Sequence, residues 1–232
     1  MELDKKVFFD IIREKLFKTL TTSQVEGIEF LLSEMQKNGW SDKNHISYVL
    51  ATVYHETGRT MRPISENGSD GYFFRMYDKN GERPRVAADL GNIETGDGVR
   101  FKGRGYVQIT GRRNYADWSR RLKLDLVNHP DFALDKDVAA VILLEGMRLG
   151  TFTGKKLSDY FNSQVNDPFN ARKIVNRLDK AEEIVAYHRV FLEALETAEV
   201  KGPEVLEEES LKARISRIEL ILEKLKEAVN GV

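Results

Sequence analysis

Residues 46–66, ISYVLATVYHETGRTMRPISE, decide the fold, because an apolar helix there delivers a lone carboxylate, Glu56, to a turn. Apolar residues recur at helical spacing along this stretch, namely Ile46, Val49, Leu50 and Val53. That spacing predicts a helix with one buried face. We expect Ser41 or Asn44 to cap its start and Gly58 to end it.

Glu56 lies in the last turn of this helix, where its position suits acid catalysis. An acidic side chain near a helix C-terminus faces the unfavourable end of the helix dipole. Beside a buried face it is also partly desolvated, and both effects favour a protonated carboxyl group. A general acid needs such a group near neutral pH. The alternative is a surface glutamate on a frayed last turn, and the helix alone does not decide between them.

Composition restricts the class of protein. The chain has 232 residues, 41% of them hydrophobic, which is enough for one substantial core. It has no cysteine and a formal net charge of −1, which argue against a cysteine-based zinc site and a dedicated nucleic-acid binder. No apolar run reaches membrane-spanning length, and no Sec export signal follows the first residues. We expect no cofactor and no metal.

The rest of the chain reads as helices around one polar region. Apolar periodicity predicts helices over residues 3–20, 21–39, 114–124, 135–150, 157–161 and 170–197. Between them, residues 67–105 are rich in glycine and charge. Residues 99–110 alternate in period two around Gly103-Arg104-Gly105, which predicts a small β-hairpin or an irregular β-lobe. Long polar loops in a compact domain often form a binding cleft. The predicted fold class is therefore mainly α (α+β), a helical domain over residues 1–198 with a small β-hairpin lobe forming a substrate cleft.

Residues 199–232 are predicted to be a linker followed by an amphipathic helix. Lys201-Gly202-Pro203 is typical of a linker or helix break. Beyond it, apolar residues step by four and three, namely Leu211, Ile215, Ile218, Leu222, Leu225 and Val229. This pattern fits a helix that packs back on the domain, leaving a monomer, or one that pairs two copies into a dimer.

The predicted cleft offers carboxylates and sugar-binding groups. Glycoside hydrolysis uses two carboxyl groups, one to protonate the leaving oxygen and one to activate water or stabilise the transition state. The loops supply several candidates besides Glu56, namely Glu66, Asp70, Asp78, Glu82, Glu94 and Asp97. Side chains able to hold a sugar follow at Tyr106, Gln108, Thr110, Asn114 and Tyr115. These residue types are compatible with a glycosidase but are not specific for one.

Several motifs in the right order resemble family 19 glycoside hydrolases, which comprise chitinases and related phage endolysins of lysozyme-like fold. Tyr54-His55-Glu56-Thr57 resembles the helix end that carries the family's catalytic acid. Residues 101–115, FKGRGYVQITGRRNY, look like its Gly-Arg-Gly-x-x-Gln-Leu-Thr/Ser signature. Further family-like segments are residues 90–92, 96–98 and 172–176. The resemblance spans roughly residues 46–195.

The resemblance implies roles for individual residues. It makes Glu56 the general acid, and it makes Gln108, Thr110 and Asn114 sugar-positioning groups, with Asn176 in the cleft. The second carboxylate departs from the plant chitinase pattern, which would place it near Asp78 or Glu82. We expect Glu66 instead, because its surroundings are closer to those in the phage enzymes; otherwise Glu66 only stabilises a turn.

The resemblance predicts an endolysin that hydrolyses the glycan backbone of bacterial peptidoglycan, between N-acetylmuramic acid and N-acetylglucosamine. It would be made in a host bacterial cytoplasm and act on the cell wall, with peptidoglycan as its partner and no nucleic acid. The alternatives are a chitinase of the same fold and a non-catalytic wall-binding module. A lytic transglycosylase outcome also remains open.

Residues 99–123 form a strongly basic stretch of the chain, which we call the basic stretch. Its cations are Arg100, Lys102, Arg104, Arg112, Arg113, Arg120, Arg121 and Lys123. Such a strip could steer the enzyme to an anionic wall, an effect that salt screens. Alternatively, these cations pair with acids of the loops: Asp70, Asp78, Glu82 and Asp97.

Overall fold

The computed structural model describes residues 2–200, and helices dominate them. The α-helices are Lys5–Ile12 (α1), Thr22–Lys37 (α2), Lys43–Glu56 (α3), Asp70–Tyr77 (α4), Pro84–Leu90 (α5), Asp97–Arg100 (α6), Arg112–Leu122 (α7), Lys136–Leu149 (α8) and Ala181–Thr197 (α9). A π-helical turn, Arg13–Phe17 (η1), follows α1, and 3₁₀ turns span Pro130–Leu134 (η2), Leu157–Asp159 (η3) and Asn170–Ile174 (η4). Two short strands, Ile64–Ser65 (β1) and Arg104–Gly105 (β2), form the sheet of this part of the chain. The predicted class, mainly α with a small β element, is confirmed.

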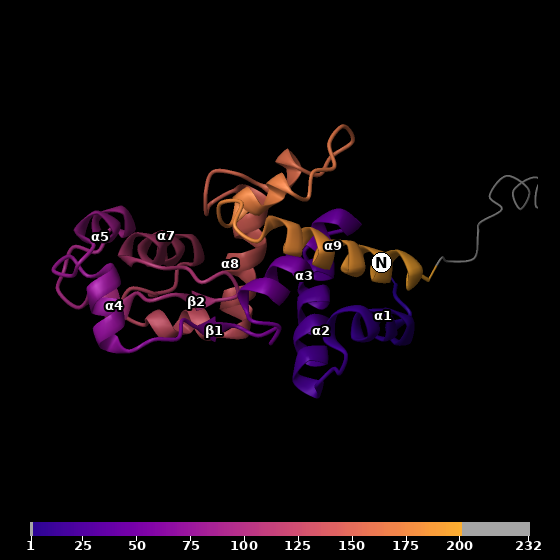
Figure 1. The fold of residues 1–232 in the computed structure, drawn as a ribbon, viewed down its shortest axis with the longest axis horizontal. Coiled ribbons are helices and arrows are strands. Elements are labelled where there is room, and N and C mark those ends of the chain that lie inside the picture. The colour runs from indigo at the N-terminus through magenta and orange to yellow at the C-terminus, as the bar shows by residue number, and fades with distance from the viewer. Residues whose placement is uncertain (1, 201–232) are drawn as a thin grey trace, which may run out of the picture.

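The molecule is elongated, with α3 near its middle (Figure 1). The strands and helices α4, α5 and α7 lie towards one end of the long axis, and α1, α2 and α9 lie towards the other. Helix α3 packs most extensively on α9. Among residues 2–200, no helix combines the length and apolar character needed to cross a membrane.

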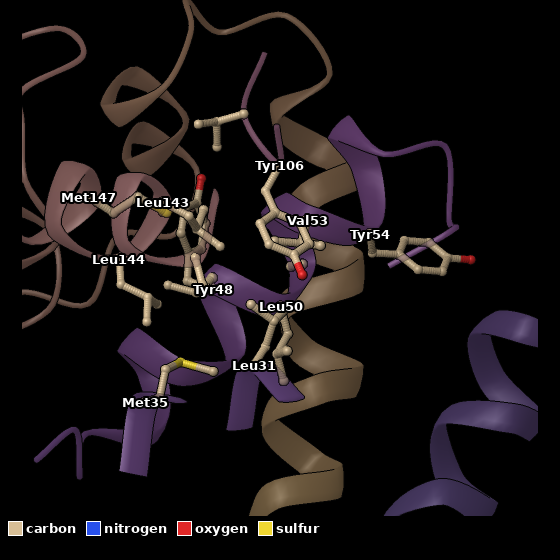
Figure 2. Packing of buried hydrophobic residues seen from close by; sticks show 14 of the residues in the cluster. Leu31, Met35, Tyr48, Leu50, Val53, Tyr54, Tyr106, Leu143, Leu144 and Met147 are labelled. Carbon is tan, nitrogen blue, oxygen red and sulfur yellow. The ribbon is translucent and has the colours of Figure 1, made fainter. Parts of the chain in front are cut away.

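Helix α3 is buried all round over much of its length, where the sequence predicted one buried face. Every residue from Ile46 to Tyr54 is buried. Figure 2 shows side chains of α3 packed with Leu31 and Met35 of α2 and with Leu143 and Met147 of α8. A helix enclosed by other helices in this way holds its C-terminal turn, and therefore Glu56, in a fixed place.

The helix caps agree in part with the sequence. Thr21 forms a capping box with Gln24 at the start of α2, and threonine is a common residue at this position. At the start of α3, Asp42 is the cap rather than Ser41 or Asn44. Its carboxylate accepts from the backbone N–H groups of Asn44 at 2.8 Å and His45 at 3.2 Å, which is the contact that an N-cap side chain must make.

The predicted hairpin over residues 99–110 is wrong in its pairing. Strand β2 pairs antiparallel with β1, in the register Ile64↔Gly105 and Ser65↔Arg104. Residues 97–100 are helical instead, and Ile109 makes only an isolated bridge to Arg104. The partner strand comes from the segment after α3, so local alternation could not reveal it. This pairing brings the residues after α3 against the Gly-Arg-Gly motif.

Two further stretches differ from the prediction. Residues 67–105, expected to be polar loops, contain the short helices α4, α5 and α6. The helix expected over residues 170–197 is divided into η4 and α9. The side chain of Arg172 causes part of this break, because its Nε donates to the carbonyl oxygen of Asp179 at 2.9 Å and holds the chain in a turn.

The two ends of the described part of the chain lie side by side. Leu3 forms a β-bridge with Glu199, and the backbone N–H of Val200 donates to the carbonyl oxygen of Glu2 at 3.0 Å. Lys43 at the start of α3 pairs with Glu199 at 2.6 Å. The predicted amphipathic helix and most of the linker before it fall in residues 201–232, outside the described residues.

Candidate active site

Glu56 ends α3 and faces a buried arginine. Its side chain is 17% exposed, and Oε1 accepts a hydrogen bond from Nη1 of Arg172 at 2.5 Å. The Arg172 side chain is only 2% exposed. A guanidinium withdrawn from water needs a carboxylate partner, so this contact fixes the position of both groups. It leaves Oε2 of Glu56 as the oxygen available to a ligand.

The Glu56–Arg172 pair joins two distant parts of the chain. Glu56 comes from the central helix and Arg172 from the turn η4, which precedes α9. The guanidinium of Arg172 makes a second contact, in which its Nε donates to the carbonyl oxygen of Asp179. The Arg172 guanidinium therefore fixes the Glu56 carboxyl group at the end of the central helix.

Glu66 directly follows β1 and is held by two hydrogen-bond donors. The hydroxyl of Tyr77 donates to Oε1 at 2.8 Å, and the backbone N–H of Gly103 donates to Oε2 at 3.0 Å. Burial, followed by the hydrogen bond to Glu66, raises the pKa of Tyr77 above its usual value, so its hydroxyl remains a donor. One donor on each oxygen fixes the orientation of the Glu66 carboxyl group.

Three predicted site residues meet at Gly103. A Cβ placed on Gly103 would lie 3.0 Å from Oε1 of Gln108, 3.1 Å from Oε2 of Glu66 and 3.2 Å from Oγ1 of Thr110. The amide of Gln108 is oriented by its Nε2, which donates to the carbonyl oxygens of Ile64 at 2.8 Å and Gly105 at 2.9 Å. The structure therefore brings Glu66, Gln108 and Thr110 together through the pairing of β1 with β2.

The backbone at Gln108 is unusual. Its φ is +54°, a conformation that residues other than glycine adopt rarely and at a cost in energy. Thr110 Oγ1 donates to the carbonyl oxygen of Gln108 at 2.9 Å, and Nδ2 of Asn114 donates to the carbonyl oxygen of Thr110 at 2.7 Å. A chain of hydrogen bonds thus runs from Gln108 to exposed Asn114 on α7 and supports the strained residue.

Gly103→Ala tests this cluster. The added methyl group has to displace side-chain oxygens of Gln108, Glu66 or Thr110 by a few tenths of an ångström. We expect roughly a tenfold or greater loss of activity, because small displacements at a reacting centre have large effects. The matched control is Gly71→Ala in α4, where the new Cβ meets nothing closer than 3.8 Å. Equal activity of the two variants in a turnover assay would contradict a role for the cluster.

Asp78 and Glu82, the alternative second carboxylates, have other surroundings. Asp78 is fully buried, and its carboxylate accepts from the backbone N–H groups of Asn80, Gly96 and Gly98 at 3.1, 2.7 and 3.3 Å. These bonds tie the end of α4 to the start of α6. The Glu82 side chain is 70% exposed and lies 3.8 Å from Arg75. Burial and full use of its oxygens make Asp78 a structural group.

The aromatic candidates are buried. Tyr106 is 2% exposed and lies in the hydrophobic core, as Figure 2 shows, where burial raises its pKa. Tyr115 is also buried; its hydroxyl donates to the carbonyl oxygen of Lys102, and burial raises its pKa to about 12. The prediction of sugar-holding aromatics at these two positions is therefore wrong, because neither ring is accessible.

Asn176 lies apart from the Gly103 cluster, in the segment after η4. It is exposed and borders a hollow with Thr153, Lys155 and Lys173. Its backbone N–H donates to the carbonyl oxygen of Arg172 at 3.0 Å, which links it to the partner of Glu56.

Four of the eight cations of the basic stretch pair with acids within the described residues. Arg112 pairs with Asp97 at 2.6 Å and with Glu94 at 2.7 Å, and Arg104 pairs with Asp131 at 2.8 Å. Although burial opposes it, the hydrogen bonding of Arg112 lowers the pKa of Asp97. Arg120 and Arg121 pair with Asp117 of their own helix. Of the four loop acids considered from the sequence, Asp97 is the one that pairs here, and the other partners come from elsewhere in the fold.

Sequence reasoning missed two residues that shape the site. The sequence indicates Arg172 only as part of the family-like segment 172–176, and no local pattern identifies it as the partner of Glu56. Tyr77 gives no signal in the sequence, because its contact with Glu66 is a tertiary one between the end of α4 and the residue after β1. Among residues 2–200, no group of three or more His, Cys, Asp or Glu side chains could hold a metal ion.

Comparisons with known proteins agree with the motifs. No protein-family model matches the chain. A glycosyl hydrolase family 19 domain-containing protein of Haemophilus influenzae is 29% identical over 137 residues, and the match covers 50% of this chain and 68% of that protein. Chitinase C from Streptomyces griseus matches 84% of this chain and 91% of its own at 15% identity and a TM-score of 0.45. A bacterial family 19 chitinase matches 86% of this chain and 97% of its own, at 18% identity and a TM-score of 0.45. The predicted resemblance to family 19 glycoside hydrolases is thus confirmed by an independent similarity in sequence.

Proposed function

We propose that the protein is a glycoside hydrolase that cleaves the glycan chains of bacterial peptidoglycan, an endolysin of bacteriophage type. The observation that carries the proposal is Glu56, a partly buried carboxyl group fixed by a buried arginine at the end of the central helix. The similarity to a family 19 glycosyl hydrolase domain supports the reaction class. The enzyme is made in the cytoplasm of a host bacterium and acts on its wall.

Glu56 is the general acid. Arg172 holds Oε1, so Oε2 carries the proton and gives it to the glycosidic oxygen as the bond to the sugar breaks. The negative charge that then develops on Glu56 lies beside the guanidinium. Because Arg172 stabilises that charge more after proton transfer than before it, the contact favours the transition state over the ground state.

Glu66 is the second carboxylate. Tyr77 and the N–H of Gly103 keep it oriented and suit its ionised form. In that form it accepts a proton from the attacking water or stabilises positive charge on the sugar ring. Gln108 and Thr110, whose side-chain oxygens face the same point, position the water or a sugar hydroxyl.

The test compares substrates with the purified full-length chain. Purified peptidoglycan and chitin oligomers are offered in parallel, and new reducing ends are measured in each. We expect faster release from peptidoglycan. Faster release from chitin would identify a chitinase instead. Binding to peptidoglycan without release from either substrate would identify a wall-binding module.

A further inference from the structure

A surface hollow whose lining includes neither Glu56 nor Glu66 carries several positively charged side chains. Its borders include Lys155 from the segment after α8, Lys173 of η4, and Arg177, and none of its lining residues is acidic. All three cations are exposed. Figure 1 shows the segment between α8 and α9 as loops and short turns at one side of the molecule. We call this feature the basic hollow.

The basic hollow is attached to the site through η4. The same turn directs Arg172 inwards to Glu56 and carries Lys173 at the surface. Thr153 secures the opposite border, because its hydroxyl contacts the carbonyl oxygens of Lys173, at 2.5 Å, and Ile174. A ligand in the hollow is therefore next to the element that positions the general acid.

The charges of the basic hollow are available to a ligand. Nζ of Lys173 donates to Oδ1 of Asn170 at 2.7 Å, which is a neutral amide, and no ion pair within residues 2–200 involves Lys155, Lys173 or Arg177. Oδ1 of Asn176 accepts the backbone N–H of Arg177 at 2.8 Å, which leaves the amide N–H groups of Asn176 as donors. This set of three cations and an amide donor is suited to carboxylates. It contrasts with Arg112, Arg120 and Arg121 of α7, which have acidic partners.

From this arrangement we propose that the basic hollow binds carboxylates of the stem peptides that branch from the glycan. The inference rests on the proposed function and makes it more specific. Peptidoglycan carries such carboxylates on the lactyl-linked peptides beside the cleaved chain, whereas chitin is uncharged. The hollow therefore makes the enzyme prefer peptide-bearing glycan, and it does so through charges that salt screens.

A binding experiment separates this inference from the catalytic one. The probe is a disaccharide-tetrapeptide fragment of peptidoglycan, compared with the same fragment after its carboxylates are converted to amides. Calorimetric titration of the wild-type chain at low salt should show about tenfold tighter binding of the acidic fragment, since each of the three exposed charges contributes modestly. Mass spectrometry after each titration confirms that the fragment is intact.

The variants assign the preference to the hollow. In Lys155→Gln with Lys173→Gln and Arg177→Gln, the acidic and amidated fragments should bind equally, whereas Lys173→Arg should keep the preference. A charge-matched control, Lys79→Gln with Arg83→Gln and Arg85→Gln, removes three exposed cations around α5 and should also keep it. Equal binding of the two fragments by the wild type, or a preference that survives in the hollow variant, would overturn the inference. A wild type that cleaves no glycan would contradict the proposed function, while the binding comparison would still decide the role of the hollow.

Discussion

Glu56→Gln is expected to lower the rate of glycan cleavage by about 10²–10⁴-fold, the range typical of losing a general acid. Glutamine keeps the shape of the side chain and an oxygen that can accept from Arg172, but it has no proton to give. The measurement is the initial rate of reducing-end release from purified peptidoglycan, compared with the wild type at equal protein concentration.

Stability must be measured beside activity, because Arg172 is buried and loses a charged partner in this variant. Removing one member of a buried ion pair costs about 3–5 kcal/mol when nothing replaces it. The glutamine oxygen should hold the loss below that range, and thermal unfolding monitored by circular dichroism will show whether the variant is folded at the assay temperature. A folded variant that cleaves within a few-fold of the wild type would remove Glu56 from the mechanism.

Glu66→Gln should produce the second large loss, about 10²-fold or more, because an amide cannot accept a proton from water. The glutamine oxygen can accept from the backbone N–H of Gly103, and its amide nitrogen can donate to the hydroxyl oxygen of Tyr77, so the fold should change little. Initial rates of turbidity loss with suspended cell walls give the comparison with the wild type.

Two matched variants are the controls for this result. Glu82→Gln alters an exposed side chain and should leave both activity and stability unchanged. Asp78→Asn weakens hydrogen bonds of a buried carboxylate to backbone N–H groups, and each such bond contributes about 1.5–3 kcal/mol. It should therefore lower the midpoint of unfolding while the folded fraction keeps its activity. If Asp78→Asn or Glu82→Gln lowers the activity of a folded protein more than Glu66→Gln does, the second carboxylate is not Glu66.

The helical scaffold could be read from the sequence because its signals are local. The periodic apolar residues of α2, α3 and α8 and the Thr21 cap each act within a few residues along the chain. The position of Glu56 at the end of α3 followed from the same periodicity and from Gly58. The cap of α3 is Asp42, one residue after Ser41, and helix propensities do not locate a helix start to within one residue.

The β region could not be read in this way. Strand β2 finds its partner after α3, about forty residues earlier in the chain, and alternation within residues 99–110 carries no information about that pairing. The burial of Tyr106 in the core also depends on tertiary packing, which local alternation does not reveal.

The contacts of the site itself were largely hidden as well. The carboxylates and the Gly103 cluster were recognised because they belong to motifs with a family resemblance. Arg172 and Tyr77 act through tertiary contacts with Glu56 and Glu66, and neither is adjacent to its partner in the sequence. The break between η4 and α9 contains no proline or glycine; it depends on the buried side chain of Arg172, which binds the chain at Asp179.

The most direct measurement is mass spectrometry of peptidoglycan digested by the wild-type chain in water labelled with oxygen-18. Acid/base hydrolysis involving Glu56 and Glu66 adds one water molecule for each glycosidic bond cleaved. We therefore predict fragments with intact stem peptides and a single oxygen-18 atom at each new reducing end. Anhydro sugar ends without the label would contradict hydrolysis and identify a lytic transglycosylase, and cut stem peptides on an intact glycan would contradict glycosidase activity altogether.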